Sequence, residues 1–278
     1  MRIASGVFVA FIVVLSLYFV TRTFRRSHRE PIALTLTDDQ GHEMKPDDLA
    51  DYTGTVNWSI ADPKNIPEAA RELLNRGREA GAAENYQEAL RLFAQAAQIA
   101  PGWAYPIYES AFTYLLMGDL GRAERDYLQV EKLEPRGFFT YQSELDCVRR
   151  ERNGEFASGT CQTYVLLADM PASDQKRSLL QKLLDRSPSL APAWQKFAGL
   201  CETDHDKIVA IEKGLASRPD PQTRGYLLIN KALILNRQGR HDEAITLLNR
   251  LVSAPDSSLD IVTNAKYTIS NLSAPPRN

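Results

Sequence analysis

The sequence contains few cysteines, and the three that it has lie far apart, at positions 147, 161 and 201. So small and scattered a set excludes the disulfide-rich scaffold that stabilises many short secreted domains. A chain of 278 residues, 44% of them hydrophobic, can bury a sizeable core without help from metals.

An excess of charge of one sign is also missing. The 33 lysines and arginines nearly balance the 35 aspartates and glutamates, which leaves a net charge of −2 and a pI near 6.1. A dedicated polyanion binder is expected to be basic and to cluster its cations on one face. We therefore expect no nucleic acid partner.

Motifs of catalytic sites are absent as well. The sequence has no Gly-x-Gly-x-x-Gly, P-loop, Gly-x-Ser-x-Gly or His-Glu-x-x-His motif, so it offers no phosphate cradle, nucleophile elbow or zincin helix. Cys201, Asp204, His205 and Asp206 lie close together, but two further ligands at the spacing of a metal site are missing. We expect no enzymatic activity, no cofactor and no metal.

What the sequence does contain is an internal repeat. Two copies of one unit follow each other from Ala70 to Arg136, offset by 34 residues. A fixed period of 34 residues is typical of helical hairpins. The two helices of a hairpin are predicted to cross where small residues face each other, Gly77 against Ala89 and Ala111 against Ala123. A proline ends each second helix because it lacks an N–H and its ring clashes with the preceding turn. The matched positions are Gly77 with Ala111, Ala89 with Ala123, Phe93 with Tyr127, and Pro101 with Pro135.

This pattern resembles tandem tetratricopeptide (TPR) repeats. Arg76, Ser110 and Val130 depart from the family pattern. The resemblance implies an all-α fold, an α-α superhelix or TPR solenoid of antiparallel helix hairpins, which we place behind one N-terminal transmembrane helix. The family is a set of binding scaffolds with unrelated partners, so it does not identify the partner. The residues that fit the pattern are Leu73, Gly77, Tyr86, Ala89, Phe93, Ala96 and Pro101, then Ile107, Ala111, Tyr114, Gly118, Ala123, Tyr127 and Pro135.

The repeat domain is predicted to cover residues 65–272, with a tail at 273–278. Asn65 can cap the first helix, and Pro67 and Glu68 suit its first turn. A terminal helix is expected because the last repeat would otherwise expose its apolar face. The predicted units are 70–103, 104–137, 138–171, an irregular stretch at 172–220, and 225–258, followed by a capping helix at 259–272.

Residues 1–26 read as a transmembrane signal-anchor with a basic flank. No charge lies between Ile3 and Val20, and that run can just span a bilayer. A cleaved signal peptide and a buried soluble helix are the alternatives. The residues from Leu17 to Val20 offer no small-x-small cleavage site, which favours the anchor.

The arginines near the anchor predict its orientation. Arg2 precedes the span, whereas Arg22, Arg25, Arg26 and Arg29 follow it. Positive charge gathers on the cytoplasmic side, so the count favours a cytoplasmic repeat domain, with the periplasm or a lumen as the close alternative.

Residues 27–64 are predicted to form a linker. They contain prolines, glycines and acidic pairs and show no helical period. The alternation from Ile32 to Leu36 leaves a short strand or a docking segment as the alternative.

The TPR resemblance implies a concave groove that binds a protein partner. Together with the predicted anchor, it predicts a membrane-anchored scaffold. Aromatic residues and arginines dominate the energetics of interfaces, although each can instead pack between repeats. The alternative functions are self-assembly as a homo-oligomer and an accessory role in an enzyme or in a secretion or biogenesis complex. The groove positions are Arg71, Arg78, Tyr105, Tyr108, Phe112, Phe139, Arg149, Arg150, Tyr226, Asn230 and Arg237.

Cys147 and Cys161 lie symmetrically about Gly154, where we expect the turn of a helical hairpin. Antiparallel helices joined there bring the two cysteines level, but the rotation of each helix decides whether the thiols meet. In the cytoplasm we expect two reduced, buried cysteines, and in an oxidising space we expect a disulfide.

Overall fold

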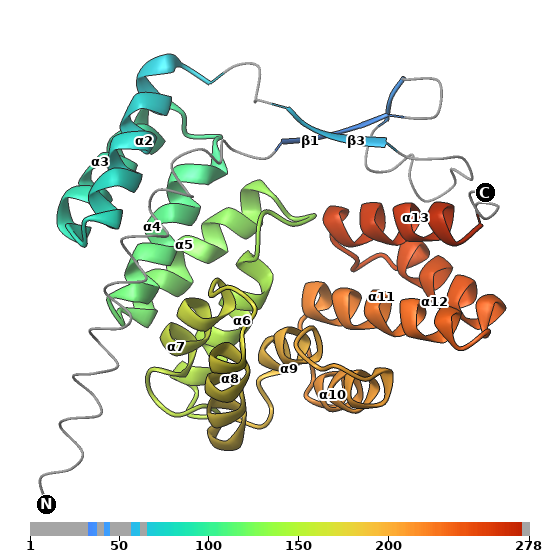
Figure 1. Cartoon of the computed structure of the whole chain (residues 1–278). Helices are drawn as coiled ribbons and strands as arrows, with labels where there is room; N and C mark the ends of the chain where they lie inside the picture. Colours follow the sequence, from blue (N-terminus) through green and yellow to red (C-terminus); the bar gives the residue numbers. More distant parts are fainter. Residues whose placement is uncertain (1–32, 38–41, 45–56, 62–65, 274–278) are drawn as a thin grey trace, which may run out of the picture. The chain divides into compact units, whose positions relative to one another are not determined.

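The computed structural model describes residues 33–37, 42–44, 57–61 and 66–273 (Figure 1). They divide into two compact units, one with residues 66–133 and the other with the remaining described residues. The predicted anchor, residues 1–26, lies outside the described residues. Among the described helices, none combines the length and the apolar character that a membrane span requires.

The first unit consists of two helical hairpins, as the repeat predicts. They are formed by α2 (Glu68–Ala82) with α3 (Tyr86–Ile99) and by α4 (Ala104–Leu116) with α5 (Leu120–Leu133). Both second helices stop two residues before a proline, at Pro101 and Pro135, as expected. The predicted cap Asn65 lies outside the described residues, and Pro67 occupies the N-cap position of α2.

The two helices of the first hairpin approach closely at glycines, but the pairing differs from the prediction. A Cβ atom placed on Gly77 would lie 2.5 Å from Cε1 of Phe93, whereas one placed on Gly81 would lie 3.6 Å from Cβ of Ala89. Gly77 therefore faces the ring of Phe93, and Ala89 faces Gly81. The equal spacing of small residues did not reveal this because it does not determine the rotation of each helix.

The repeat core predicts a stability effect at Ala123, which has no exposed surface. Ala123→Leu is expected to lower the free energy of unfolding by about 1–3 kcal/mol, because added methylenes fit a packed helix crossing only if the helices shift. Thermal melts of the fragment 65–278 measure the loss. Ala94→Leu is the matched control, since Ala94 lies exposed on α3. Equal melting temperatures of the two variants would show that Ala123 does not lie at the helix crossing.

Most hairpin turns rest on one residue in the left-handed backbone region. Gly118, Gly154 and Gly239 have φ values of +76°, +77° and +78°, and Glu84 has +59° at the same place in the first hairpin. Glycine adopts this conformation without a steric penalty. The turn predicted at Gly154 is confirmed.

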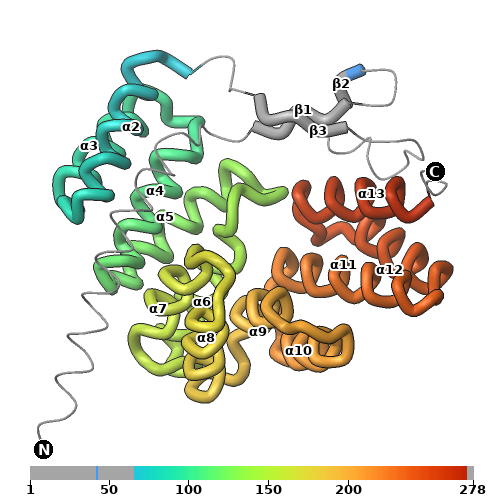
Figure 2. Tube along the Cα trace, viewed as in Figure 1, coloured from blue at the N-terminus to red at the C-terminus, as the bar shows by residue number. Residues whose placement is uncertain are grey.

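The second unit contains eight helices in the described part of the chain, traced in Figure 2. Three of them begin with a side-chain cap: Ser173, Thr203 and Asp220 accept hydrogen bonds from backbone N–H groups three residues further on. The helices are α6 (Tyr141–Arg152), α7 (Thr160–Ala168), α8 (Asp174–Arg186), α9 (Ala191–Ala198), α10 (Asp204–Ala216), α11 (Pro221–Arg237), α12 (His241–Ser253) and α13 (Leu259–Ser273).

The second unit also makes a contact that a plain solenoid lacks, because α6 packs against α11. The Ser143 hydroxyl lies 2.8 Å from the Thr223 hydroxyl and donates to Oδ1 of Asp220 at 3.3 Å. The N–H of Leu259 donates to the carbonyl of Arg136 at 2.6 Å. In a simple repeat array each unit touches only its neighbours. Here α7 to α10 bridge two segments that meet directly.

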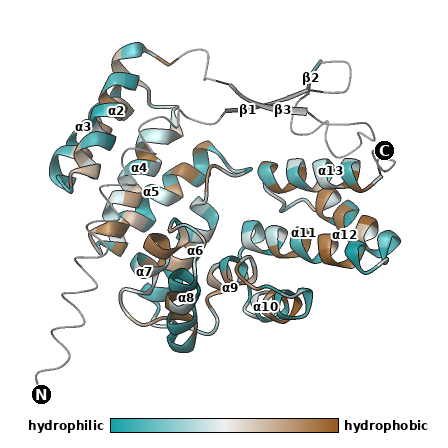
Figure 3. Cartoon of the chain, viewed as in Figure 1, coloured by the Kyte–Doolittle hydropathy of each residue, from teal (hydrophilic) through white to brown (hydrophobic). Residues whose placement is uncertain are grey.

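The last hairpin and the final helix share one hydrophobic core. Figure 3 shows hydrophobic and hydrophilic residues interspersed along α11, α12 and α13, the pattern of helices buried on one face. Leu248 and Ile261 are fully buried, and Tyr267 on α13 is 52% exposed. The core consists of Ile229, Ala232, Leu235, Ala244, Leu248, Leu251, Val252, Ile261, Val262 and Ala265.

The stretch predicted as a linker, residues 27–64, contains a three-stranded sheet. β1 (Ala33–Thr37) lies between β2 (Glu43–Met44) and β3 (Asn57–Ala61) and pairs antiparallel with both. Leu36 is opposite Met44 on one side and Trp58 on the other. The linker prediction is therefore wrong for these residues, and the alternative of a short strand is the one found. The sequence left this open because pairing partners, and not local propensity, determine whether a short alternating run forms a strand.

Candidate functional site

The aromatic residues predicted to line the groove of the first unit are core side chains. Tyr105, Tyr108 and Phe112 are only 3–4% exposed. The ring of Tyr108 meets that of Tyr127 edge to face at 6.1 Å between centroids, and the ring of Tyr105 meets that of Trp103 at 6.0 Å. The predicted groove is not open along these three residues.

The two arginines predicted beside them are engaged within the unit. The Arg78 guanidinium lies 3.6 Å from a carboxylate oxygen of Glu109 and 5.6 Å from the centre of the Tyr105 ring. Arg71 donates to the carbonyl of Ile66 at 3.3 Å. Arg78 therefore links α2 to α4, and Arg71 holds the segment that enters α2.

In the second unit the predicted groove residues divide by exposure. Arg149 and Arg237 are exposed, Phe139, Tyr226 and Asn230 are half-buried, and Arg150 is buried. Arg237 makes two hydrogen bonds to Asp204, at 2.6 and 3.0 Å, and the Tyr226 hydroxyl donates to Asp260 at 2.7 Å.

Arg150 is a structural residue with acidic side chains beside its guanidinium. Its Nε donates to Glu155 at 3.2 Å, its Nη1 lies 3.5 Å from Asp146, and its guanidinium stacks 4.4 Å from the centre of the Phe156 ring. Nη1 also donates to the carbonyl of Ser217 at the end of α10. Arg150 therefore ties α6 to a segment far along the chain, and a partner cannot reach it without disturbing this packing.

The contact between α6 and α11 contains a buried carboxyl group, that of Asp220. Burial raises the pKa of Asp220, and the hydrogen bonds from Thr223 and Ser143 oppose this effect. Burial likewise raises the pKa of Asp146, although the neighbouring Arg150 counteracts it. Asp220 caps the first turn of α11, so its hydrogen bonds support the fold.

Two open grooves lie among the described residues of the second unit. The larger, which we call the α10–α12 groove, has a volume of about 590 Å³. Its floor is apolar, with Ile208, Leu235 and Leu247, and its rim carries the ion pairs Lys231–Glu212 and Arg240–Glu243, at 2.7 and 2.6 Å. Asp242 and Arg250, also on the rim, form no ion pair within the described part of the chain. The groove is lined by Ile208, Glu212, Lys231, Leu235, Gln238, Arg240, Asp242, Glu243, Thr246, Leu247 and Arg250.

The smaller α8–α10 groove, of about 350 Å³, lies on the other side of α10. Its base is aromatic: the rings of Trp194 and Phe197 meet edge to face at 5.9 Å, and the Lys213 ammonium lies 4.7 Å from the centre of the Trp194 ring. The groove is lined by Arg177, Gln181, Trp194, Phe197, Cys201, Glu202, Thr203, Asp206, Val209, Ala210 and Lys213.

The cluster from Cys201 to Asp206 forms one edge of this smaller groove. Burial, followed by the charge of Asp206, raises the pKa of Cys201, which disfavours the nucleophilic thiolate. Asp204 is engaged with Arg237. Across the described residues, no three His, Cys, Asp or Glu side chains are grouped as a metal site requires.

Val209 lines the smaller groove and is 41% exposed. The prediction of the groove from first-helix positions missed it. The sequence nevertheless carries a signal, because Ile208, Val209, Ala210 and Ile211 form an unbroken apolar run on α10. A helix buries a stripe and not its whole circumference, so one of four consecutive apolar residues has to face outwards.

Comparisons with known proteins agree with the repeat architecture. The family model described as a tetratricopeptide repeat matches residues 226–256, which are most of α11 and all of α12. No curated protein matches the sequence.

Solved structures with a similar course of helices have low identity. MamA from Desulfovibrio magneticus RS-1 is 16% identical, with 67% of this chain and 94% of that chain covered and a TM-score of 0.34. A thermophilic TPR protein from Thermus thermophilus is 20% identical, with 73% and 100% covered and a TM-score of 0.31. TM-scores this low do not establish a shared arrangement of helices. The family model and the hairpins together identify residues 226–256 as a tetratricopeptide repeat within an array of helical hairpins.

Proposed function

We propose that this protein is a non-enzymatic adaptor, a helical-repeat scaffold that holds a protein partner at a membrane. The observation that carries the proposal is the exposed surface of α10, which contributes residues to both open grooves and presents Val209 in the smaller one. Protein interfaces have this composition, an apolar centre within a polar rim. The partner is proposed to bind across α8 to α12, on a surface different from the one that the first-helix positions predict.

A photo-reactive amino acid placed at Val209 in the full-length chain tests this proposal. Cross-linking in native membranes is expected to trap a different protein at this position. Ile99 is the matched control, because it is also an aliphatic helix residue and is 43% exposed, but it belongs to the first unit. A cross-link only to a second copy of the chain would support the self-assembly alternative, and equal products at both positions would contradict an α10 site.

Binding should also respond to charge at this surface. Val209→Glu is expected to weaken capture of the cross-linked partner by about tenfold or more, because a carboxylate in an apolar interface centre loses hydration that nothing replaces. Ile99→Glu should leave capture unchanged. Since both sites are exposed, both variants should keep their stability within about 0.5 kcal/mol, which thermal melts can check.

The membrane part of the proposal rests on the apolar run at residues 3–20. Val13→Arg together with Val14→Arg should release the protein into the soluble fraction, because each arginine at mid-membrane costs roughly 2.5–3.5 kcal/mol on insertion scales. Val13→Leu together with Val14→Leu is the control. Retention of the arginine variant after a carbonate wash would mean that another part of the chain holds it at the membrane.

A further inference from the structure

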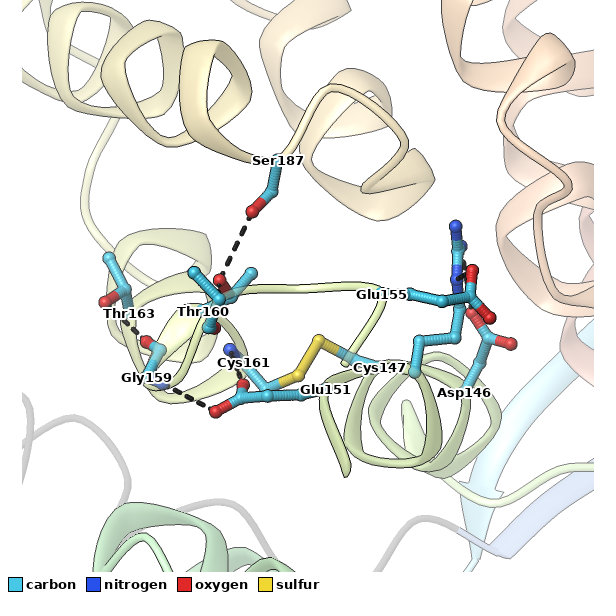
Figure 4. Close-up of a disulfide and its surroundings, with 11 residues drawn as sticks. Asp146, Cys147, Glu151, Glu155, Gly159, Thr160, Cys161, Thr163 and Ser187 are labelled. Atoms are coloured by element: carbon cyan, nitrogen blue, oxygen red, sulfur yellow. Dashed lines mark hydrogen bonds and ion pairs between the residues drawn. A yellow bond between two sulfur atoms is a disulfide. The ribbon is translucent and has the colours of Figure 1, made fainter. Parts of the chain in front are cut away.

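The hairpin of α6 and α7 contains a disulfide between Cys147 and Cys161 (Figure 4). Their Cα atoms are 5.8 Å apart, within the range that a disulfide spans without backbone movement. Helix rotation, which the sequence left open, therefore brings the two sulfurs together.

Contacts that do not involve sulfur hold α7 in the orientation that the bond needs. The Glu151 carboxylate accepts hydrogen bonds from the N–H groups of Gly159 and Cys161, at 2.5 and 2.8 Å, as Figure 4 shows. A carboxylate at a helix N-terminus satisfies free N–H groups and complements the helix dipole. At the other end of α7 the Lys176 ammonium donates to the carbonyls of Ala168 and Met170. Both ends of this short helix are thus fixed by charged side chains from its neighbours.

The sulfur atoms are shielded from solvent. Cys147 is 1% exposed and Cys161 is 0% exposed. Thiol–disulfide exchange requires a thiolate to reach one sulfur of the bond, so neither an oxidant nor a reductant can act on this pair in the closed fold. The bond has to form before α6 and α7 are covered, and it then persists.

We infer that the repeat domain folds in an oxidising compartment, on the non-cytoplasmic side of the membrane, where an oxidised dithiol carrier joins Cys147 to Cys161 during folding. One cysteine thiolate attacks the disulfide of the carrier and forms a mixed disulfide. The second thiolate then attacks that bond and releases the carrier as a dithiol. The chain loses two protons and two electrons, and the carrier gains them. The finished bond is a permanent structural cross-link and not a redox switch.

This inference reverses the orientation that the arginines favour. It places the amino terminus in the cytoplasm and Arg22, Arg25, Arg26 and Arg29 on the far side, if residues 3–20 stay in the membrane. The charge rule is a bias, and a cytosol kept reducing by glutathione and thioredoxin opposes a disulfide directly. A cleaved signal peptide would deliver the domain to the same compartment.

The thiol state of the full-length protein in intact cells tests the inference. Cells are quenched in acid, the protein is denatured and alkylated without reduction, and its peptides are read by mass spectrometry. We expect a linked peptide pair containing Cys147 and Cys161, with Cys201 alkylated as the internal control. Cys147→Ser should remove the linked pair and leave Cys161 alkylated. Alkylation of both Cys147 and Cys161 in most wild-type molecules would overturn the inference.

Two further measurements test the compartment of the domain and the permanence of the disulfide separately. A reporter enzyme that is active only after oxidation and export, fused after Asn278, should be active; an inactive but intact fusion would overturn the compartment. Dithiothreitol added to native membranes should leave the bond intact until denaturant is present, and rapid reduction without denaturant would overturn the permanent cross-link. Neither readout depends on a partner, so a failure of the adaptor proposal remains distinguishable.

Discussion

Phe93→Ala is expected to lower the free energy of unfolding by about 3–5 kcal/mol, because removal of a buried phenyl ring loses its transfer free energy and leaves a cavity. Phe93 is 1% exposed, and its ring lies directly over Gly77. Urea unfolding of the fragment 65–278 measures the loss.

Gly77→Ala supplies an internal control. Its effect on the free energy of unfolding should have opposite signs in the native protein and in the Phe93→Ala variant. In the native protein the new methyl group would lie 2.5 and 2.7 Å from two ring carbons of Phe93, so the ring has to move, at a cost of about 1–3 kcal/mol. In the Phe93→Ala background the ring is absent, and alanine instead stabilises α2 by roughly 0.5–1 kcal/mol relative to glycine. Additive effects of the two substitutions would show that Gly77 and Phe93 do not touch.

Loss of the disulfide is the second large effect. Cys147→Ala with Cys161→Ala is expected to destabilise the fragment by about 3 kcal/mol, because the cross-link closes a chain segment with a sequence separation of 14 and so limits the unfolded state. Unfolding of the native fragment with and without reductant in the denaturant should give a difference of similar size. Cys201→Ala is the control, since this cysteine lies outside the bond and is only half-buried; its effect should be clearly smaller. Equal stability of the oxidised and reduced protein would mean that the hairpin of α6 and α7 gains nothing from the bond.

Local elements could be predicted from the order of residues alone. Prolines at 101 and 135 end helices because they cannot continue the hydrogen-bond ladder, and Gly154 turns the chain because it accepts a positive φ. The 34-residue repetition of large and small residues predicted two antiparallel hairpins over 70–136, and the structure contains them. These features depend on residues within about one repeat of each other, so they can be predicted from the order of residues along the chain.

Which faces of these helices stay open depends on how the helices pack against one another. The pattern placed Tyr105, Tyr108 and Phe112 in a groove, but their rings are buried. The pairing of Ser143 with Asp220 and Thr223 joins segments some 80 residues apart and closes α6 onto α11. The rotation of each helix about its axis determines whether Cys147 meets Cys161 and whether Gly77 meets Phe93. Repeat spacing does not encode these relations, because they follow from how all helices of a unit share one buried core.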